Sequence, residues 1–169
     1  MSIGQALLPE YDIEMANTRK VLERIPEDKF DWKAHAKSNT IGWVAAHVAN
    51  IPSWTSITLT SDSLDVAPPG GEPYRTPPAT SVPGLLAEFD KNVAAGRAAL
   101  QTTGDEEFFK PWSLLAGGQT IFTLPRVAVI RSFVLNHMIH HRAHLCVYLR
   151  LNDVPVPGLY GPSADDAGV

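Results

Sequence analysis

The chain has 169 residues, of which 44% are hydrophobic and 19% charged, and its formal net charge is −4 at pH 7. This balance is typical of one globular domain with its own core, so we expect residues 1–169 to form a single domain. The negative charge and the scattered Lys and Arg residues exclude a nucleic-acid-binding surface from the expected functions.

Four stretches repeat apolar residues every three or four positions, and this spacing predicts four helices. The first stretch covers residues 8–25 and ends at Pro26. The second begins after Thr40, a residue that caps helices well, and continues to residue 57. Pro52 lies inside this second stretch, so we expect the helix to kink or end early there.

A long loop without periodicity separates the second helix from the third. It covers residues 62–81 and is rich in proline and glycine, and loops of this length are often functional. The third helix is predicted to start after Ser81 and to end near Gly104. The fourth is predicted to run without interruption from Pro125 to about Leu151.

Residues 108–124, between the third and fourth helices, contain a hairpin signal around Gly117 and Gly118. An isolated hairpin is marginally stable, so it would have to lie on the helices. We therefore predict an all-α fold, a four-helix bundle with a long crossover after the second helix and a short hairpin before the fourth. The alternative is an α+β domain in which the hairpin region grows into a sheet.

Cysteine content and hydropathy bound the location of the protein. Cys146 is the single cysteine, which excludes an intramolecular disulfide and indicates a reducing compartment. The sequence has no apolar run of about 18 residues that could span a membrane, and its first residues do not resemble a signal sequence. These features predict a cytoplasmic protein that makes no contact with a membrane.

Histidines are concentrated in the fourth predicted helix. Residues four apart on a helix lie on one face, and two imidazoles at this spacing can bind one metal ion. Two such pairs exist, His137 with His141 and His140 with His144. The first pair lies on the apolar stripe that faces the protein interior, which makes it the better candidate. His47 lies on the corresponding stripe of the second helix and can face the same interior.

Three histidines on core stripes predict a metal site formed by His47, His137 and His141. A single histidine on an apolar face is usually a packed core residue, but burying three imidazoles without partners would be costly. Three neutral imidazoles plus a water give the open arrangement of a reactive site. Nitrogen ligands suit Zn, Ni, Cu or Fe better than Mg or Ca, and we expect Zn or Ni. His144 could be a fourth ligand, a proton shuttle or a packed residue.

Other side chains around these histidines have less specific roles. Trp43 and Trp54 could line a pocket, or could be ordinary core residues at helical spacing. We expect His140 and Arg142 to face solvent or a subunit contact. Cys146 is expected to be a buried, unreactive thiol, because nothing in its sequence neighbourhood would activate it.

Three segments together resemble the DinB superfamily, which includes the YfiT-like metal-dependent enzymes. They are NTIGWVAAHVANI (residues 39–51), RSFVLNHMIHHRAHL (131–145) and VPGLYGPSADD (156–166). The resemblance covers essentially the whole chain and implies a four-helix bundle. It also implies a metal triad of one histidine from the second helix and two from the last, at the positions of His47, His137 and His141. A homodimer and the use of low-molecular-weight thiols are further implications.

The function expected from these observations is a metal-dependent enzyme that acts on a small molecule. A divalent metal on the three histidines would activate a low-molecular-weight thiol for S-transfer. One alternative is a hydrolase that uses metal-activated water. Another is a non-catalytic metal-binding stress protein, whose metal would be closed off by a fourth protein ligand such as His144.

Overall fold

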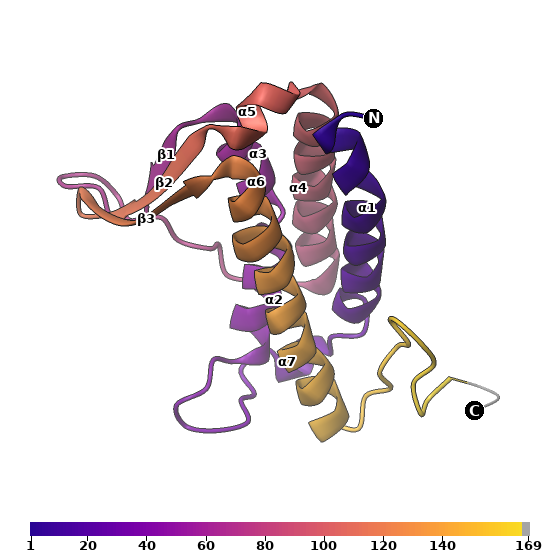
Figure 1. Cartoon of the computed structure of the whole chain (residues 1–169). Helices are drawn as coiled ribbons and strands as arrows, with labels where there is room; N and C mark the ends of the chain where they lie inside the picture. Colours follow the sequence, from indigo (N-terminus) through magenta and orange to yellow (C-terminus); the bar gives the residue numbers. More distant parts are fainter. Residues whose placement is uncertain (167–169) are drawn as a thin grey trace.

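The computed structural model describes residues 1–166 and shows long helices side by side with a small sheet at one end (Figure 1). The first half contains α1 (Ile3–Leu22), the 3-10 helix η1 (Glu27–Lys29), α2 (Ile41–Asn50), α3 (Ser53–Thr60) and β1 (Ser63–Asp65). The second half contains α4 (Val82–Thr102), α5 (Asp105–Phe109), β2 (Pro111–Ala116), β3 (Gln119–Pro125), α6 (Arg126–Val129), the π-helix η2 (Ile130–Asn136) and α7 (His137–Leu151).

The long helices begin and break where local side chains dictate. The Thr40 hydroxyl accepts a hydrogen bond from the Trp43 backbone N–H at 3.2 Å and caps α2. Ser81 caps α4 in the same way. The predicted interruption at Pro52 is confirmed, because the second helical stretch is divided there into α2 and α3. Helix α1 starts before the predicted residue 8, because Ser2 forms a capping box at its N-terminus.

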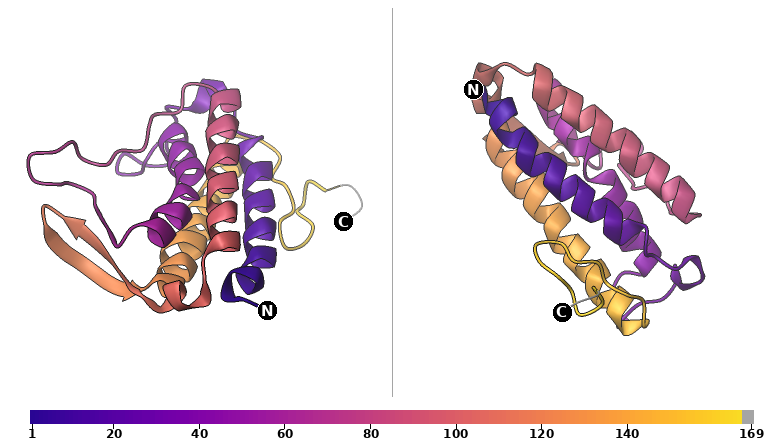
Figure 2. Two further views of the ribbon diagram at one scale, coloured as in Figure 1. Left: turned by 90° about the horizontal axis from the view of Figure 1, so that it is seen from above. Right: turned by 90° about the vertical axis from the view of Figure 1, so that its right-hand side faces the viewer.

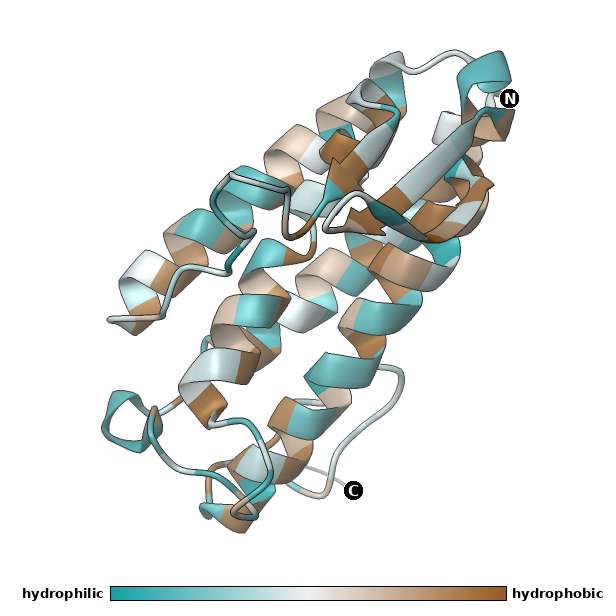
Figure 3. Ribbon diagram, turned by 90° about the vertical axis from the view of Figure 1, so that its left-hand side faces the viewer, coloured by the Kyte–Doolittle hydropathy of each residue, from teal (hydrophilic) through white to brown (hydrophobic). Residues whose placement is uncertain are grey.

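Helix α1 packs between α4 and α7, as the right-hand view of Figure 2 shows. Brown apolar segments alternate with teal polar ones along the helices visible in Figure 3. Apolar residues buried between the helices form one continuous core, which includes Tyr11, Val21, Leu22, Ile41, Val48, Ile51, Phe89, Leu100, Phe108, Ile130, Leu135, Met138, Leu145 and Leu149. This core holds α2 and α7 in fixed positions, and these two helices carry the histidines of interest.

The all-α prediction is wrong, because the fold also contains a three-stranded mixed sheet. Strand β2 lies in the middle, antiparallel to β3 and parallel to β1. Gly117 and Gly118 connect β2 to β3 with φ angles of 62° and 76°, which residues with a side chain rarely adopt. The hairpin is thus present, but the four-helix bundle is not the whole fold, and the alternative with a sheet lies nearer to the structure.

Strand β1 pairs with the hairpin through a carboxylate as well as through the backbone. The Asp65 carboxylate accepts hydrogen bonds from the N–H groups of Gly117 and Gly118 at 3.1 Å and 2.7 Å. It also accepts one from Ala67 at 2.9 Å, and these three donors lower the pKa of Asp65. The strand has only three residues and lies within the stretch that the sequence predicts as loop, so no alternation of apolar residues revealed it.

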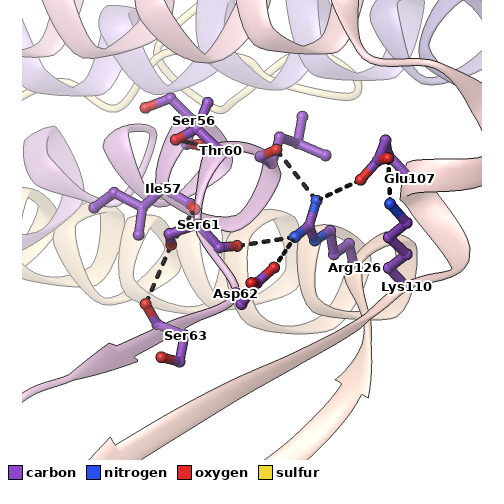
Figure 4. Close-up of polar contacts among 10 residues, drawn as sticks. Ser56, Ile57, Thr60, Ser61, Asp62, Ser63, Glu107, Lys110 and Arg126 are labelled. Atoms are coloured by element: carbon purple, nitrogen blue, oxygen red, sulfur yellow. Dashed lines mark hydrogen bonds and ion pairs between the residues drawn. The ribbon is translucent and has the colours of Figure 1, made fainter.

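A buried arginine joins the sheet to the helices (Figure 4). Arg126 is 4% exposed and donates hydrogen bonds to the carboxylates of Asp62, at 2.6 Å, and Glu107, at 3.1 Å. It also donates to the backbone carbonyls of Leu59 and Ser61. A buried guanidinium needs such partners, because an unpaired charge in the interior is costly. Arg126 therefore fixes the end of α3 and the start of β1 against the beginning of the last helical stretch.

Arg142 does not face solvent, contrary to the sequence-based expectation, because its side chain is 1% exposed. It forms an ion pair with Glu14 of α1 at 2.7 Å and donates to the Thr18 hydroxyl at 3.1 Å. Tyr160 from the C-terminal segment hydrogen-bonds both Arg142 and Glu14. This cluster locks α7 onto α1. Among residues 1–166, none of the helices is long and apolar enough to span a bilayer.

Candidate metal site

Three histidines from two helices converge on one point. His47 comes from the last turn of α2, and His137 and His141 come from successive turns of α7. The Nε2 atom of His137 lies 3.3 Å from Nε2 of His47 and 2.8 Å from Nε2 of His141. The structure thus brings together the three histidines that the sequence selected, with one ring nitrogen of each turned toward the others.

The contacts around His137 Nε2 exceed what hydrogen bonding between imidazoles can satisfy. An imidazole nitrogen has one position in the ring plane, which is either an N–H or a lone pair. His137 Nε2 takes part in two short N···N contacts, so at most one of them is a normal hydrogen bond. If the three nitrogens instead point their lone pairs at one cation, all three are satisfied at once. Zn–N bonds of 2.0–2.1 Å in tetrahedral geometry separate neighbouring nitrogens by about 3.3 Å, so the donor set fits a divalent metal.

Burial keeps these imidazoles in the neutral form that metal binding requires. Burial is the main cause that lowers the pKa of His47 to about 4, and the neighbouring His137 lowers it further. Burial also lowers the pKa of His141 to about 3, with smaller contributions from the surrounding histidines. The pKa of His137 is lowered by burial as well, although a hydrogen bond with the Phe133 backbone opposes this. At neutral pH all three ring systems are therefore uncharged and offer lone pairs.

A wall of aromatic rings surrounds the three histidines. The Trp43 ring stacks on His47 with centroids 4.9 Å apart and planes inclined by 20°. The Trp54 ring meets His47 edge-on at 5.6 Å and stacks on Phe133 at 5.2 Å. These contacts fix the ring orientation of His47. Trp43 and Trp54 both line a pocket, which is one of the two roles that the sequence left open for them.

The pocket beside His47 has a volume of about 560 Å³. Its lining consists of Trp43, His47, Trp54, Tyr74, Arg75, Thr76 and Pro78. Four of these residues belong to the loop that follows β1, so this loop forms one wall of the pocket and α2 and α3 form the other. The volume suits a small molecule, and the lining includes one basic and no acidic side chain.

Tyr74 is a functional candidate that the sequence did not single out. Its hydroxyl oxygen accepts hydrogen bonds from Asn50 Nδ2 at 2.6 Å and from Trp54 Nε1 at 2.8 Å. Because both neighbours donate, the Tyr74 O–H proton is left free for a third partner. The loop position carries no periodic signal, and only its proximity to α2 in the folded chain reveals this residue.

The remaining histidines and the cysteine lie outside this cluster. His144 and His140 group with His141, but neither belongs to the set formed with His47 and His137. His144 is therefore not a fourth member of that set within residues 1–166. Cys146 is partly buried, and burial raises the pKa of its thiol, which agrees with the unreactive role expected from the sequence.

Comparison with known proteins identifies the family. The family model described as DinB superfamily matches residues 10–145, which include all three histidines of the cluster. This chain belongs to the DinB superfamily. The resemblance carried by the three sequence segments is thus confirmed, and a histidine cluster fit to bind a metal agrees with membership of the DinB superfamily.

Relatives of this DinB-superfamily protein include proteins from two Bacillus species. It is 24% identical over 159 residues to YrdA of Bacillus subtilis (strain 168), named as uncharacterized, and covers 89% of that protein. A crystal structure of a DinB-like protein from Bacillus cereus ATCC 10987 matches 92% of this chain and 97% of its own, with a TM-score of 0.69 and 21% identity. YjoA, a DinB-like protein from Bacillus subtilis, matches 89% and 95% of the two chains, with a TM-score of 0.66 and 14% identity. The two structures share the fold of this chain.

Proposed function

We propose that this protein is a metal-dependent enzyme that holds one divalent transition metal, Zn or Ni, on His47, His137 and His141. The observation that carries the proposal is the position of His137 Nε2, within 3.3 Å of both other Nε2 atoms. Such a meeting of three neutral nitrogens is the donor set of a borderline metal rather than of Mg or Ca.

An open side of the metal supports a reactive role over a purely structural one. When bound, a divalent metal supplies Lewis-acid chemistry and lowers the pKa of a thiol or water beside it. His144 does not join the three histidines, so no fourth protein ligand closes the site within the described residues. His47 lines the pocket together with Trp43 and Trp54, so a metal on the three histidines would lie beside this pocket. A closed, non-catalytic metal site would need such a fourth ligand, which the described residues do not offer beside the three histidines.

The pocket favours a small substrate that combines an apolar body with a negatively charged group. Trp43 and Trp54 offer flat apolar surfaces, and Arg75 is the one charged side chain that lines the pocket. The free O–H of Tyr74 would donate a hydrogen bond to an oxygen of the bound molecule. These groups would hold the substrate beside the open side of the metal and orient it.

The nucleophile in this proposal is an external low-molecular-weight thiol. Cys146 does not line the pocket, and its thiol pKa is raised, so the chain does not furnish a thiolate of its own. The pocket also lacks Asp and Glu residues, so no carboxylate is placed to act as a base for water. This composition favours thiol transfer over the alternative of hydrolysis by activated water.

Metal content measured by mass spectrometry on purified variants tests the first part of the proposal. Each of His47→Ala, His137→Ala and His141→Ala should lose the tightly bound Zn or Ni, because two remaining imidazoles hold a metal poorly. The control is His35→Ala, which removes an exposed histidine outside the cluster and should retain the metal. Unchanged metal content in His137→Ala would refute the site.

Activity assays with a panel of thiols and small electrophiles test the second part. We expect turnover to require metal and added thiol together, and Cys146→Ala to remain active. Tyr74→Phe should raise KM or lower kcat while the metal content stays that of the native protein, because the phenol contacts Asn50 and Trp54 and not the histidines. Turnover that needs metal but is indifferent to thiol would favour the hydrolase instead.

We also propose a homodimer, an assembly that the family resemblance implies. The structure contains a single chain, so the proposal rests on that implication. Static light scattering over micromolar concentrations measures the mass directly, and a mass of about 18 kDa throughout would reject the dimer.

A further inference from the structure

Two further cavities adjoin the pocket of the candidate metal site. The middle cavity has a volume of about 260 Å³ and shares Trp43, Thr76 and Pro78 with the pocket. The outer cavity has a volume of about 380 Å³ and shares Ala46 and residues 77–79 with the middle one. Because each cavity shares walls with the next, the three form a series that starts beside the histidines.

One segment of the loop after β1 covers this series. Its residues 74–76 line the pocket, 76–79 line the middle cavity and 77–80 line the outer cavity. The opposite wall of each cavity includes residues of α2. A molecule longer than the pocket would therefore extend between α2 and this segment.

The covering segment is held at its two ends. The Tyr74 hydroxyl accepts hydrogen bonds from Asn50 and Trp54, and beyond the other end the Val82 N–H donates to the Glu27 carboxylate at 2.6 Å. Between these ends, the backbone of residues 75–80 forms no hydrogen bond with the rest of the described chain. The segment thus spans α2 without pairing to it, and space remains beneath it.

Small apolar side chains form the connection between the middle and outer cavities. Ala46 of α2 lines both cavities from one side, and Ala79 of the covering segment lines both from the other. Phe30 adds an aromatic wall to the middle cavity, and the buried Leu85 of α4 adds an apolar wall to the outer one. A passage between two alanines suits an unbranched methylene chain, whose apolar surface leaves water there.

The charged groups along the series give a bound molecule a direction. Arg75 lines the pocket and neither of the other cavities, so an anionic group is attracted to the pocket. Asp31 lines the middle cavity and would repel an anion there. Glu88 and Lys91 line the outer cavity, but they form an ion pair with each other at 3.3 Å, so their charges offset.

We propose that the pocket and the two cavities together bind one anionic molecule with an extended apolar chain. Its carboxylate or similar group lies beside Arg75, and its chain passes between Ala46 and Ala79 into the outer cavity. The inference deepens the proposed function and rests on it in one respect, that the reacting part of the substrate lies in the pocket beside the metal. It names a chain-bearing acid as the substrate class, rather than a compact molecule that the pocket alone would hold.

Calorimetric titration of the metal-loaded, full-length protein with straight-chain carboxylates from butanoate to decanoate tests this assignment. Each methylene that enters the passage should lower Kd by about fourfold. Alkylammonium ions of the same chain lengths should bind at least about tenfold more weakly, because Arg75 repels them. In Arg75→Gln this preference for acids should disappear at every chain length, and a preference that persists would overturn the proposed direction.

Two variants narrow the passage from opposite sides. In both Ala46→Leu and Ala79→Leu, Kd for decanoate should rise by about tenfold or more, whereas Kd for butanoate should stay at its native value. Ala79 lies in the loop, so its variant carries the test even if a larger side chain disturbs α2. The matched control is Ala87→Leu, which adds the same side chain at an exposed position of α4 that lines none of the three cavities.

Metal content measured on the same samples separates this inference from the proposed function. A native protein that holds its metal but binds all chain lengths equally would overturn the chain-binding passage and leave the metal site intact. A gain with chain length that is the same in the native protein and in both leucine variants would overturn it too, because the chain would then lie elsewhere. A protein without metal that still shows the gain, and loses it in both variants, would refute the metal site and keep the passage.

Discussion

The buried ion pair between Glu14 and Arg142 should control both the stability of the fold and the position of α7. Glu14 is 6% exposed and Arg142 is 1% exposed, and their charged atoms are 2.7 Å apart. Tyr160 completes the cluster by donating its one O–H proton to the Glu14 carboxylate, whose two oxygens lie 2.9 Å and 2.8 Å from the hydroxyl. Glu14→Gln keeps the size and shape of the side chain but removes its charge, which leaves the Arg142 guanidinium buried without a counter-ion.

The expected loss follows from the burial. Two unit charges about 4 Å apart attract by about 4 kcal/mol at an effective dielectric constant of about 20. Removing one partner of a buried pair typically costs about 3–5 kcal/mol, because the other charge remains desolvated. The Thr18 hydroxyl and the Glu14 backbone carbonyl still accept hydrogen bonds from Arg142 in the variant. We therefore expect a loss near the lower end, about 3 kcal/mol in the free energy of unfolding.

Urea unfolding with linear extrapolation measures this loss. The matched control is Glu88→Gln, which removes the carboxylate of a solvent-exposed pair with Lys91 at 3.3 Å and should cost less than about 1 kcal/mol. The double variant with Glu14→Leu and Arg142→Met should lose less stability than Glu14→Gln, because it leaves no buried charge. A Glu14→Gln protein that is as stable as the Glu88→Gln control would refute the reasoning.

Two further predictions concern a close helix contact and the C-terminal segment. A Cβ atom at Gly96 would lie 2.3 Å from the hydroxyl of Tyr11, so Gly96→Ala should reduce the free energy of unfolding by about 1–3 kcal/mol in the same urea assay. Arg150 and the Val156 N–H hold the pKa of Asp165 below its usual value. The contacts of the Asp165 carboxylate therefore stabilise the C-terminal segment fully when the pH is above the usual pKa of Asp, and this stabilisation is lost as the pH falls through the lowered pKa. Amide-exchange protection at Val156 should drop in acid, and constant protection down to about pH 2 would contradict this.

The sequence predicted the helices and the histidine cluster because both depend on local periodicity. Apolar spacing fixes which face of a helix is buried, and residues four apart share that face in any helix. His137 and His141 therefore had to be neighbours, whatever the rest of the fold. His47 required only that α2 turn its own buried face toward α7. The metal-binding role of the three residues stays a prediction until metal content is measured.

Features that depend on contacts between distant segments could not be predicted from sequence patterns. From the sequence of its own helix, Arg142 is expected at the surface. Only the ion pair with Glu14 of α1 offsets the free-energy cost of burying its charge. Strand β1 is too short to show alternation and exists because the β2–β3 hairpin offers it a partner. The π-helical geometry of η2, which ends directly before His137, was also missed, because the apolar stripe reads as an unbroken α-helix there.

The sheet that the sequence did not predict also shapes the candidate site. The Val66 N–H donates to the Leu115 carbonyl of β2 at 2.9 Å, and the Tyr74 N–H donates to the Val66 carbonyl at 2.9 Å. The hairpin thereby fixes Val66, Val66 fixes the backbone of Tyr74, and the Tyr74 hydroxyl reaches Asn50 on α2. One wall of the pocket is thus held by strand pairing and the opposite wall by helix packing. The helices place the nitrogens that would bind the metal, and the sheet places the loop that would select the substrate.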